Sequence, residues 1–353
     1  MTPALLELGL SPFFTRQLSA EELANCHPAR ITEVQRSGVT ASDGDAQWQL
    51  PLGGAWFKRP AEQRPTVGDW VLLDAGHQKL LRLLERKSVF TRPVAGNRSE
   101  LQLIAANVDT LFVVTSCNEE FSESRLERYL ALALEAGVEP VVVLSKADLC
   151  ADADAYRQRA QNVSSSVPME LVNAQDPASL QRLGGWVSSG TTVALVGSSG
   201  VGKSTIVNSL ARAALADTGA IREQDAKGRH TTTFRALHRL RGGGLLLDVP
   251  GIRELKIAEM DESLADLFAD VEALTRLCKF SNCGHGSEPG CAVRLAISEG
   301  RLDPRRLSNY QKLLREDAHN SNSIAERRRY NKKFSKSVQA HIQMKRNRGE
   351  QER

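Results

Sequence analysis

Residues 141–149 read VVVLSKADL, and this stretch decides how the chain folds. Its apolar, mostly β-branched start predicts a strand buried on both faces, as in a parallel sheet covered by helices. The strand ends in the polar residues Ser145, Lys146, Ala147 and Asp148. The stretch therefore predicts a buried strand that carries a polar binding element at its end.

The chemistry of Asp148 indicates which ligand this element binds. A carboxylate accepts two hydrogen bonds at once. Guanine offers an adjacent ring N–H and exocyclic amine to such a fork, whereas adenine has no matching pair. Lys146 can lie along the base, and Asn173 and Ala174 are placed where a second loop would close over it.

A second motif, GSSGVGKST at residues 197–205, matches the phosphate-loop pattern GxxxxGK[ST]. It follows the apolar run VALV and precedes a predicted helix that begins at Lys203. Its glycines let backbone N–H groups face phosphates, Lys203 supplies a charge for the outer phosphates, and the Ser204 hydroxyl reaches Mg²⁺. This loop comes after the base-reading element, the reverse of the order in ordinary small GTPases, so either one motif is accidental or the domain has been cut and rejoined in a different order.

Two further segments predict the rest of a magnesium site. Asp248 ends an apolar run and begins DVPG, where the carboxylate can hold the Mg²⁺ shell and Gly251 can give its N–H to the terminal phosphate. The stretch AKGRHTTTF at 226–234 can supply a hydroxyl from Thr231 or Thr232 when the γ-phosphate is present. The spacing does not choose between the two threonines, and a plain polar turn is the alternative.

The chain around these motifs alternates between strands and helices. Apolar runs predict strands, helical periodicity predicts the segments between them, and the alternation predicts a doubly wound, mostly parallel α/β domain. The predicted strands are 108–115, 141–144, 193–196 and 245–248, and the predicted helices are 124–136, 151–161 and 203 to about 214.

The amino-terminal part has a different pattern of apolar and turn residues. Residues 1–25 predict a short amphipathic helical lead-in. The segments ARITEV, WQLPL, AWFKR and DWVLLD are then separated by turn residues, which predicts short strands in a small five-stranded barrel of the OB type. Such barrels often present a face to oligonucleotides, but a β-module that only packs on its neighbour is the alternative.

Three cysteines and a histidine crowd together near the carboxyl end, as Cys278-x4-Cys283-x-His285-x5-Cys291. Three thiolates and one imidazole are the ligand set of a closed, structural zinc site. Three reduced cysteines that only pack are the alternative. Cys26, Cys117 and Cys150 are scattered, and we interpret them as ordinary packing residues.

Charge and hydropathy indicate which kinds of partner and which compartment to expect. Residues 326–353 hold ten Lys or Arg against three Glu, which favours a polyanion such as nucleic acid, with a merely solvated helix as the alternative. No run of 18 or more apolar residues occurs, so we expect no membrane span. The amino terminus lacks a basic start, so we expect a cytoplasmic protein.

Taken together, the order SKAD, NA loop, phosphate loop, GRHTTT and DVPGIRE resembles the circularly permuted, ribosome small-subunit-dependent GTPases of the RsgA family. The resemblance covers nearly the whole chain. It implies a monomeric GTP hydrolase that binds the small (30S) ribosomal subunit and its rRNA late in maturation, and that couples GTP hydrolysis to release. Two departures are Ser145, where the family usually has Asn, and VNAQD at the second base-side loop.

The hydrolytic group is the least defined part of the pattern. Ordinary GTPases place a water-orienting Gln directly after the DxxG glycine, but here that position is Ile252, a hydrophobic replacement that the family shares. His230 is the best substitute in this chain, because an imidazole can hydrogen-bond to water near neutral pH. The alternative is that His230 only braces its loop. Two other functions also stay open, a non-catalytic RNA-binding scaffold that holds nucleotide and an ATP-using P-loop enzyme.

We therefore predict a lead-in at 1–28, an OB-like barrel at 29–97, a permuted GTPase domain at 98–261, a mainly α zinc-binding domain at 262–325 and a basic tail at 326–353. The expected cofactors are GTP or GDP, Mg²⁺ and one structural Zn²⁺. The expected catalytic residue is His230, and Ser204, Thr231, Thr232 and Asp248 are the magnesium candidates. The predicted GTP-binding residues are Ser145, Lys146, Ala147, Asp148, Asn173, Ala174, Gly197, Ser198, Ser199, Gly200, Val201, Gly202, Lys203, Ser204, Thr205 and Gly251. The predicted zinc ligands are Cys278, Cys283, His285 and Cys291.

Overall fold

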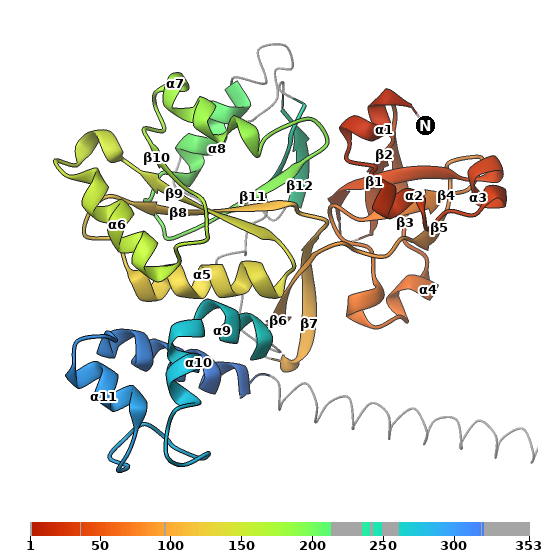
Figure 1. The fold of residues 1–353 in the computed structure, drawn as a ribbon. Helices are drawn as coiled ribbons and strands as arrows, with labels where there is room; N and C mark the ends of the chain where they lie inside the picture. Colours follow the sequence, from red (N-terminus) through yellow and green to blue (C-terminus); the bar gives the residue numbers. More distant parts are fainter. Residues whose placement is uncertain are drawn as a thin grey trace, which may run out of the picture. The chain divides into compact units, whose positions relative to one another are not determined.

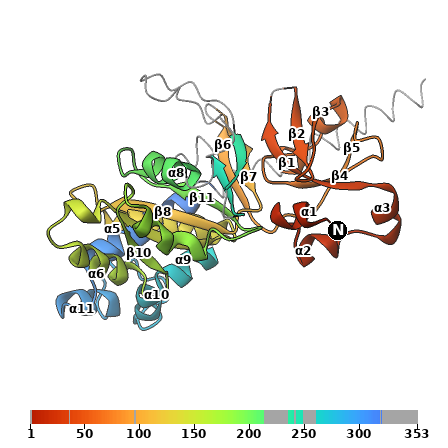
Figure 2. The ribbon, with the colours of Figure 1, turned by 90° about the horizontal axis from the view of Figure 1, so that it is seen from above.

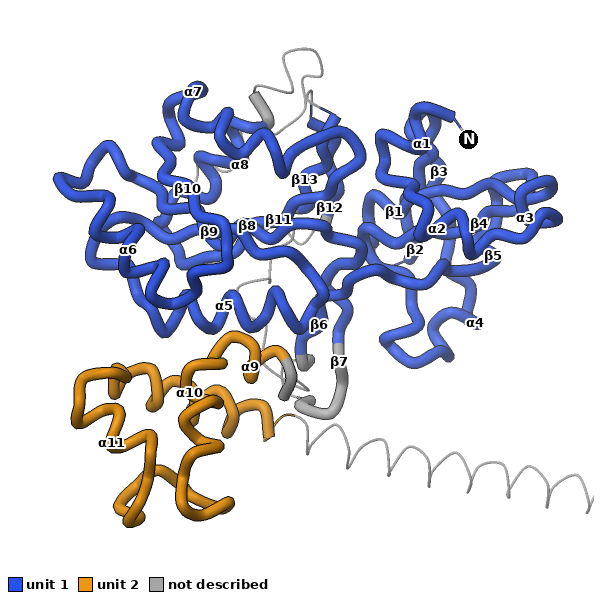
Figure 3. The backbone as a smooth tube through the Cα atoms, in the orientation of Figure 1, with its two compact units in different colours: residues 1–92, 101–256 blue, residues 93–100, 257–353 orange. Residues whose placement is uncertain are grey.

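The computed structural model describes residues 2–35, 37–94, 97–212, 235–240, 243–248, 261–318 and 320. The chain divides into two compact units, one of residues 1–92 with 101–256 and one of residues 93–100 with 257–353 (Figure 3). The division into five parts made from the sequence stays a prediction.

A mixed sheet with five parallel strands forms the centre of the first unit (Figure 1). Its spatial order is β10-β9-β8-β11-β13-β12, and only β12 runs antiparallel to its neighbour β13. The strands are β8 (Thr110–Ser116), β9 (Glu139–Ser145), β10 (Met169–Val172), β11 (Thr192–Val196), β12 (Arg235–Arg239) and β13 (Leu245–Asp248).

Helices cover both faces of this sheet. Figure 1 shows α5 and α6 on one side and α7 and α8 on the other. Their bounds are α5 (Glu123–Glu135), α6 (Ala153–Val163), α7 (Pro177–Leu180) and α8 (Lys203–Arg212), and the 3₁₀ turns are η2 (Ala147–Leu149) and η3 (Gln181–Gly185). Helix α5 begins where the Ser122 hydroxyl accepts the Arg125 N–H, and it buries Leu126 and Leu130 against the sheet side.

The strand order explains how the two motifs can occur in reverse. Strand β11, which leads into the phosphate loop, lies between β8 and β13, although β8, β9 and β10 all precede it in the chain. The register pairs Val196 with Val113 and Ser145 with Ser116, so the parallel strands end at one common edge. Ligands of open α/β sheets bind at this edge. Opening the chain at another loop therefore leaves the binding edge intact.

The amino-terminal strands form an antiparallel group in the order β3-β2-β1-β4-β5. They are β1 (His27–Val34), β2 (Gly38–Ser42), β3 (Gln47–Pro51), β4 (Trp70–Leu73) and β5 (Leu80–Leu83). Their shared core is aliphatic, as the low aromatic content indicates. Strand β1 also pairs with β12 through Glu33–Ala236 and Val34–Arg235, so one sheet runs through both strand groups.

One prediction for this part needs correction. AWFKR is not a strand, because Gly54–Phe57 forms the short helix α4, which buries Trp56 and is followed by η1 (Ala61–Gln63). The apolar residues of this segment bury one side chain, Trp56, in a helix and do not form the alternating face of a strand. The predicted helical lead-in consists of three short helices, α1 (Pro3–Glu7), α2 (Pro12–Thr15) and α3 (Ala20–Asn25), and Gly9 and Pro12 separate the first two.

A buried arginine joins the lead-in, the antiparallel strands and the mixed sheet. The Arg30 guanidinium donates to the carbonyls of Leu8 (2.6 Å), Gly68 (3.2 Å) and Asn107 (2.8 Å). Burial lowers the pKa of Arg30 to about 10, so the group stays charged at neutral pH. Three paired donors compensate the cost of burying this charge, so the junction is held by a satisfied polar group.

The second unit is mainly helical. Its elements include α9 (Asp261–Leu267), α10 (Ala269–Thr275), α11 (Ala292–Ser298) and a helical stretch at 304–318, around a core that contains Phe268, Val271 and Val293. The two-stranded sheet of β6 (Val89–Val94) and β7 (Asn97–Ala106) contributes residues to both units. Within the described ranges, no helix is long and apolar enough to cross a membrane.

Candidate nucleotide site and metal centre

The phosphate loop connects β11 directly to α8 (Figure 2). Its three glycines have positive φ angles of 146° at Gly197, 80° at Gly200 and 92° at Gly202. A Cβ atom on Gly197 would lie 2.1 Å from the Val114 carbonyl oxygen, so only glycine fits there. The loop thus has the left-handed, closely packed backbone that its glycine spacing predicts.

Lys203 begins α8 and turns back over the loop. Its side chain is buried, and its ammonium donates to the carbonyls of Gly197 (2.8 Å) and Ser198. The next two residues, Ser204 and Thr205, are exposed in the first turn of the helix. A charged group and free hydroxyls at a helix amino terminus suit a phosphate ligand with Mg²⁺.

Ser145 links the end of β9 to the phosphate loop, and its predicted role in nucleotide binding stays a prediction. Its side chain is fully buried, and its hydroxyl oxygen lies 2.6 Å from the Val201 carbonyl and 3.2 Å from the Thr115 carbonyl. Lys146 has a left-handed φ of 57°, which turns the chain out of β9 toward the exposed Asp148. Ser145 therefore braces the base-reading loop against the phosphate loop.

The Ser145→Ala substitution is expected to lower the free energy of unfolding by about 1–3 kcal/mol, because it leaves the buried Val201 carbonyl without its hydrogen-bond donor. Chemical denaturation of the full chain measures this loss. Ser298→Ala is the matched control, since that exposed hydroxyl only meets the Leu295 carbonyl at a helix end. Equal stability of the two variants would contradict the bracing role.

The second base-side loop is tied to the phosphate side as well. Asn173 accepts the Gln175 N–H (2.9 Å) and donates its own N–H to the Ser179 hydroxyl (2.9 Å). The Ala174 carbonyl accepts a hydrogen bond from Ser209 on α8 (2.9 Å). The sequence gives no sign of Ser209, because its partner is 35 positions away. The three predicted nucleotide segments thus meet at one edge of the sheet.

The remaining magnesium and catalytic candidates are only partly placed. Asp248 ends β13, where its backbone pairs with Ala236, and its side chain lies outside the described residues. His230, Thr231, Thr232 and Gly251 also lie outside the described residues, as does Ile252. Their roles stay predictions.

The four predicted zinc ligands come together in the second unit, with ligand atoms within 4.8 Å of one another. The Cys278 and Cys291 sulfurs are 3.9 Å apart, and the His285 Nδ1 atom lies 3.6 Å from each of them. Zinc bonds of about 2.3 Å to sulfur and about 2.0 Å to nitrogen give tetrahedral edges of about 3.8 Å and about 3.6 Å. The cluster therefore fits a zinc ion, with Nδ1 as the histidine ligand atom.

Backbone groups hold this cluster in shape. His285 has a left-handed φ of 57°, and the Glu288 carboxylate accepts the N–H groups of Gly284 (2.9 Å) and Gly286 (2.7 Å) on either side of it. Burial raises the pKa of the Cys278 thiol, but hydrogen bonds from the backbone of Val293 and Ala292 help to bring it below its ordinary value. A thiol with a lowered pKa gives up its proton to a metal more readily.

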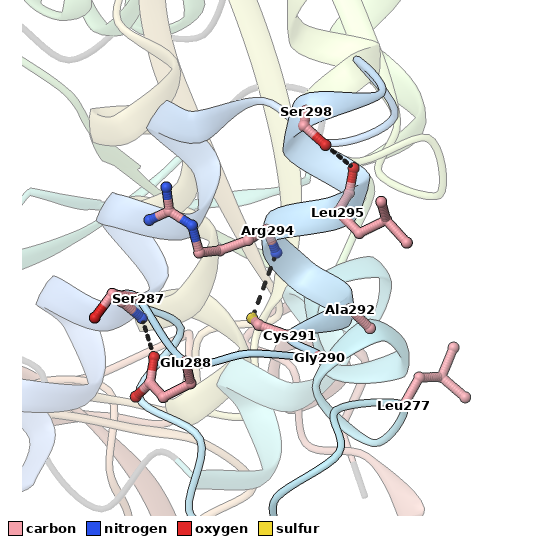
Figure 4. Close-up of a pocket in the computed structure, with 10 residues that line it drawn as sticks. Leu277, Ser287, Glu288, Gly290, Cys291, Ala292, Arg294, Leu295 and Ser298 are labelled. Carbon is pink, nitrogen blue, oxygen red and sulfur yellow. Dashed lines mark hydrogen bonds between the residues drawn. The ribbon is translucent and has the colours of Figure 1, made fainter.

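An open hollow adjoins the cluster on the side of Cys291 (Figure 4). The Arg294 N–H donates to the Cys291 sulfur (3.5 Å), and this hydrogen bond starts α11. The side chains of Leu277 and Leu295 extend from the rim, and they are 71% and 53% exposed. The hollow is open surface beside a closed ligand set, which suits a structural rather than a catalytic metal.

Sequence reasoning missed one charged residue at the nucleotide edge. Arg125, in the first turn of α5, donates from Nη1 to the Ser198 hydroxyl of the phosphate loop. The two residues are 73 positions apart, and Arg125 sits in no motif. Its helical periodicity marks it only as a polar position.

Comparison with known proteins finds a matching family model and similar sequences. The family model described as RsgA GTPase matches residues 83–258. A small ribosomal subunit biogenesis GTPase RsgA 2 of Vibrio vulnificus is 47% identical over 96% of this chain and 95% of its own. The small ribosomal subunit biogenesis GTPase RsgA of Mesorhizobium japonicum is also 47% identical, over 91% and 92%.

Solved structures show the same architecture. The crystal structure of YjeQ from Thermotoga maritima is 26% identical with a TM-score of 0.61, covering 82% of this chain and 98% of its own. The structure of YloQ, described as a circularly permuted GTPase, is 25% identical with a TM-score of 0.58, covering 86% and 96%. The likeness to YloQ agrees with the reversed order of the two motifs in this chain.

Proposed function

This chain belongs to the RsgA GTPase family, and on that premise we propose that it hydrolyses GTP during late maturation of the small (30S) ribosomal subunit. The observation that carries the proposal is the junction of the base-reading and phosphate-binding loops through Ser145 and Val201. A guanine nucleotide bound along this edge would contact both loops. The relatives' names supply the ribosomal subunit as the setting.

The hydrolysis would be an in-line attack of water on the γ-phosphorus, with GDP as the leaving group. Lys203 would hold the outer phosphates, because its ammonium already lies over the loop that cradles them. Ser204, Asp248 and either Thr231 or Thr232 would hold Mg²⁺, which supplies charge neutralisation between the β- and γ-phosphates when bound. His230 would orient the attacking water, since Ile252 has no polar group for that task.

The Asp148→Asn substitution is expected to weaken GDP binding by about 10- to 150-fold, because it replaces one acceptor oxygen of the base-binding fork with a donor. Fluorescent-nucleotide titration with GDP, GTP and ATP as competitors measures the change. Asp154→Asn is a matched control, since Asp154 is 84% exposed in a loose ion pair with Arg157. Unchanged GDP affinity in Asp148→Asn, or ATP competing as well as GTP, would favour an ATP-using enzyme instead.

The ribosomal partner is proposed to bind through three parts, namely the antiparallel strands, the zinc-bearing helices and the basic residues 326–353. Helix α4 and the residues after it carry suitable chemistry, since Phe57 is 47% exposed and Arg59 stacks 4.0 Å from the Trp56 ring. Exposed rings stack on bases, and cations contact phosphates. The basic tail lies outside the described residues. We propose that the protein acts there as a cytoplasmic monomer with one structural zinc.

A catalyst and a nucleotide-holding scaffold differ in turnover. Phosphate release by the full chain, measured over many turnovers with and without purified small ribosomal subunits, separates the two functions. A GTPase of this kind releases more than one phosphate per protein, and faster with the subunits. Release of one phosphate or less under both conditions would leave only the scaffold.

A further inference from the structure

Two cationic side chains converge on one residue of the phosphate loop. The Arg125 guanidinium donates to the Ser198 hydroxyl, and the Lys203 ammonium donates to the Ser198 carbonyl. In phosphate loops this lysine reaches the β- and γ-phosphates. Both cations therefore lie beside the loop that would hold the phosphates of a bound nucleotide.

The fold places Arg125 at this edge for structural reasons. Helix α5 follows β8, and its first turn is fixed by the hydrogen bond from the Arg125 N–H to the Ser122 hydroxyl (3.4 Å). Strand β8 pairs with β11 up to Val113 and Val196, directly before the phosphate loop. The start of α5 and the phosphate loop therefore follow the carboxyl ends of adjacent strands, and Arg125 needs no movement of the backbone to face the loop.

The acidic groups around Arg125 leave it available to a phosphate. Glu120 is its carboxylate partner at 3.6 Å, and the two side chains are 58% and 41% exposed, so water screens their attraction. Glu123 is engaged elsewhere, because it pairs with Arg159 at 2.7 Å. A γ-phosphate carries more charge than Glu120 and would replace it as the partner of the guanidinium.

We propose that Arg125 is a catalytic residue that binds the γ-phosphate of GTP and stabilises the transition state of hydrolysis. The proposal rests on the GTPase function above. The water oxygen bonds to the γ-phosphorus, the bond from that phosphorus to the β–γ bridging oxygen breaks, and the electron pair leaves with GDP. The proton lost by the water passes to an oxygen of the released phosphate. Arg125 stays protonated throughout and stabilises charge on the transferring group, as arginines do in other GTPases. Its role is distinct from that of a group that orients water.

The test compares Arg125→Gln and Arg125→Lys with the unmodified full chain at saturating small ribosomal subunits. Arg125→Gln is expected to lower kcat about 10²-fold, the typical effect of removing one preorganised donor to a developing charge, while GDP affinity is unchanged. Arg125→Lys keeps the positive charge but loses the planar set of guanidinium donors, so we expect its kcat to lie between those of Arg125→Gln and the unmodified chain. Binding of GDP with aluminium fluoride, which imitates the transferring phosphoryl group, should weaken in parallel with kcat.

Two further variants keep the outcomes distinguishable. Arg157→Gln removes an equal charge from a loose pair with the exposed Asp154, so it leaves Glu123 paired with Arg159 and should not change kcat. Lys203→Ala tests the nucleotide site itself and should abolish turnover. An unchanged kcat in Arg125→Gln, or an equal loss of GDP and GTP affinity with normal kcat, would overturn the proposal while the GTPase function stands. Absence of GTP turnover in the unmodified chain would overturn both.

Discussion

Replacing Cys283 with serine is expected to bring the zinc content well below one atom per chain and to unfold the helices around the cluster. The reason lies in the size of those helices. Helices α9, α10 and α11 have seven residues each, and helices shorter than about 12–15 residues are marginal in water. A structural zinc contributes about 10–16 kcal/mol in zinc-finger peptides. Losing one of four ligands therefore removes much of what orders this unit.

Elemental analysis and hydrogen exchange over residues 261–318 measure this outcome. Cys26→Ser is the matched control, because Cys26 is a half-buried cysteine outside the cluster. Nucleotide binding should persist in Cys283→Ser, since the mixed sheet has its own core of residues such as Phe112, Val143 and Leu246. A purified chain without zinc whose second unit is fully folded would show that the cluster only packs.

The second large effect is expected at His230. Replacing it with alanine should lower the subunit-stimulated rate of GTP hydrolysis by about 10²–10⁴-fold, the usual contribution of a proton-transferring or positioning group. GTP affinity should stay the same, because the imidazole faces water rather than the nucleotide in this role. Single-turnover phosphate release with saturating subunits measures the rate.

The His230→Gln variant separates the two ways in which the histidine could act. Glutamine can orient water by hydrogen bonding but cannot take its proton near neutral pH. Partial recovery in His230→Gln would indicate positioning, and no recovery would indicate a general base. A full stimulated rate in His230→Ala would place the activating group in another side chain or in the rRNA.

Four of the five parallel strands could be predicted because they are continuous apolar runs, whereas β10 is short and contains Glu170, so the sequence did not predict it. The run at 245–248 coincides with β13, and 193–196 lies within β11. The antiparallel part was harder, because turn residues interrupt its strand pattern, and AWFKR has the composition of a strand but forms α4. Strand β12 was also missed, since RALHR carries three cations or imidazoles and gains its partners β13 and β1 only in the fold.

For the candidate sites too, the sequence predicts some parts but not others. Glycine spacing predicts the phosphate loop, and ligand spacing predicts the Cys₃His cluster, because both depend on residues close together in sequence. The Ser145 hydroxyl instead meets a carbonyl 56 positions away, and Arg125 meets Ser198 at 73 positions. Contacts of this kind depend on the strand order of the sheet, which residue spacing alone does not reveal.

The strand order of the mixed sheet has a consequence for folding of the chain during its synthesis. Synthesis runs from the amino terminus, so β8, β9 and β10 leave the ribosome before β11, the strand that must pair with β8. Thr192, at the start of β11, comes 83 positions after Asp109, and at about 5–20 residues per second this delay lasts about 4–17 s. During that time the inner edge of β8 offers unpaired backbone groups to any passing strand. The permuted order makes the nascent chain, rather than the finished enzyme, the form most open to wrong pairing.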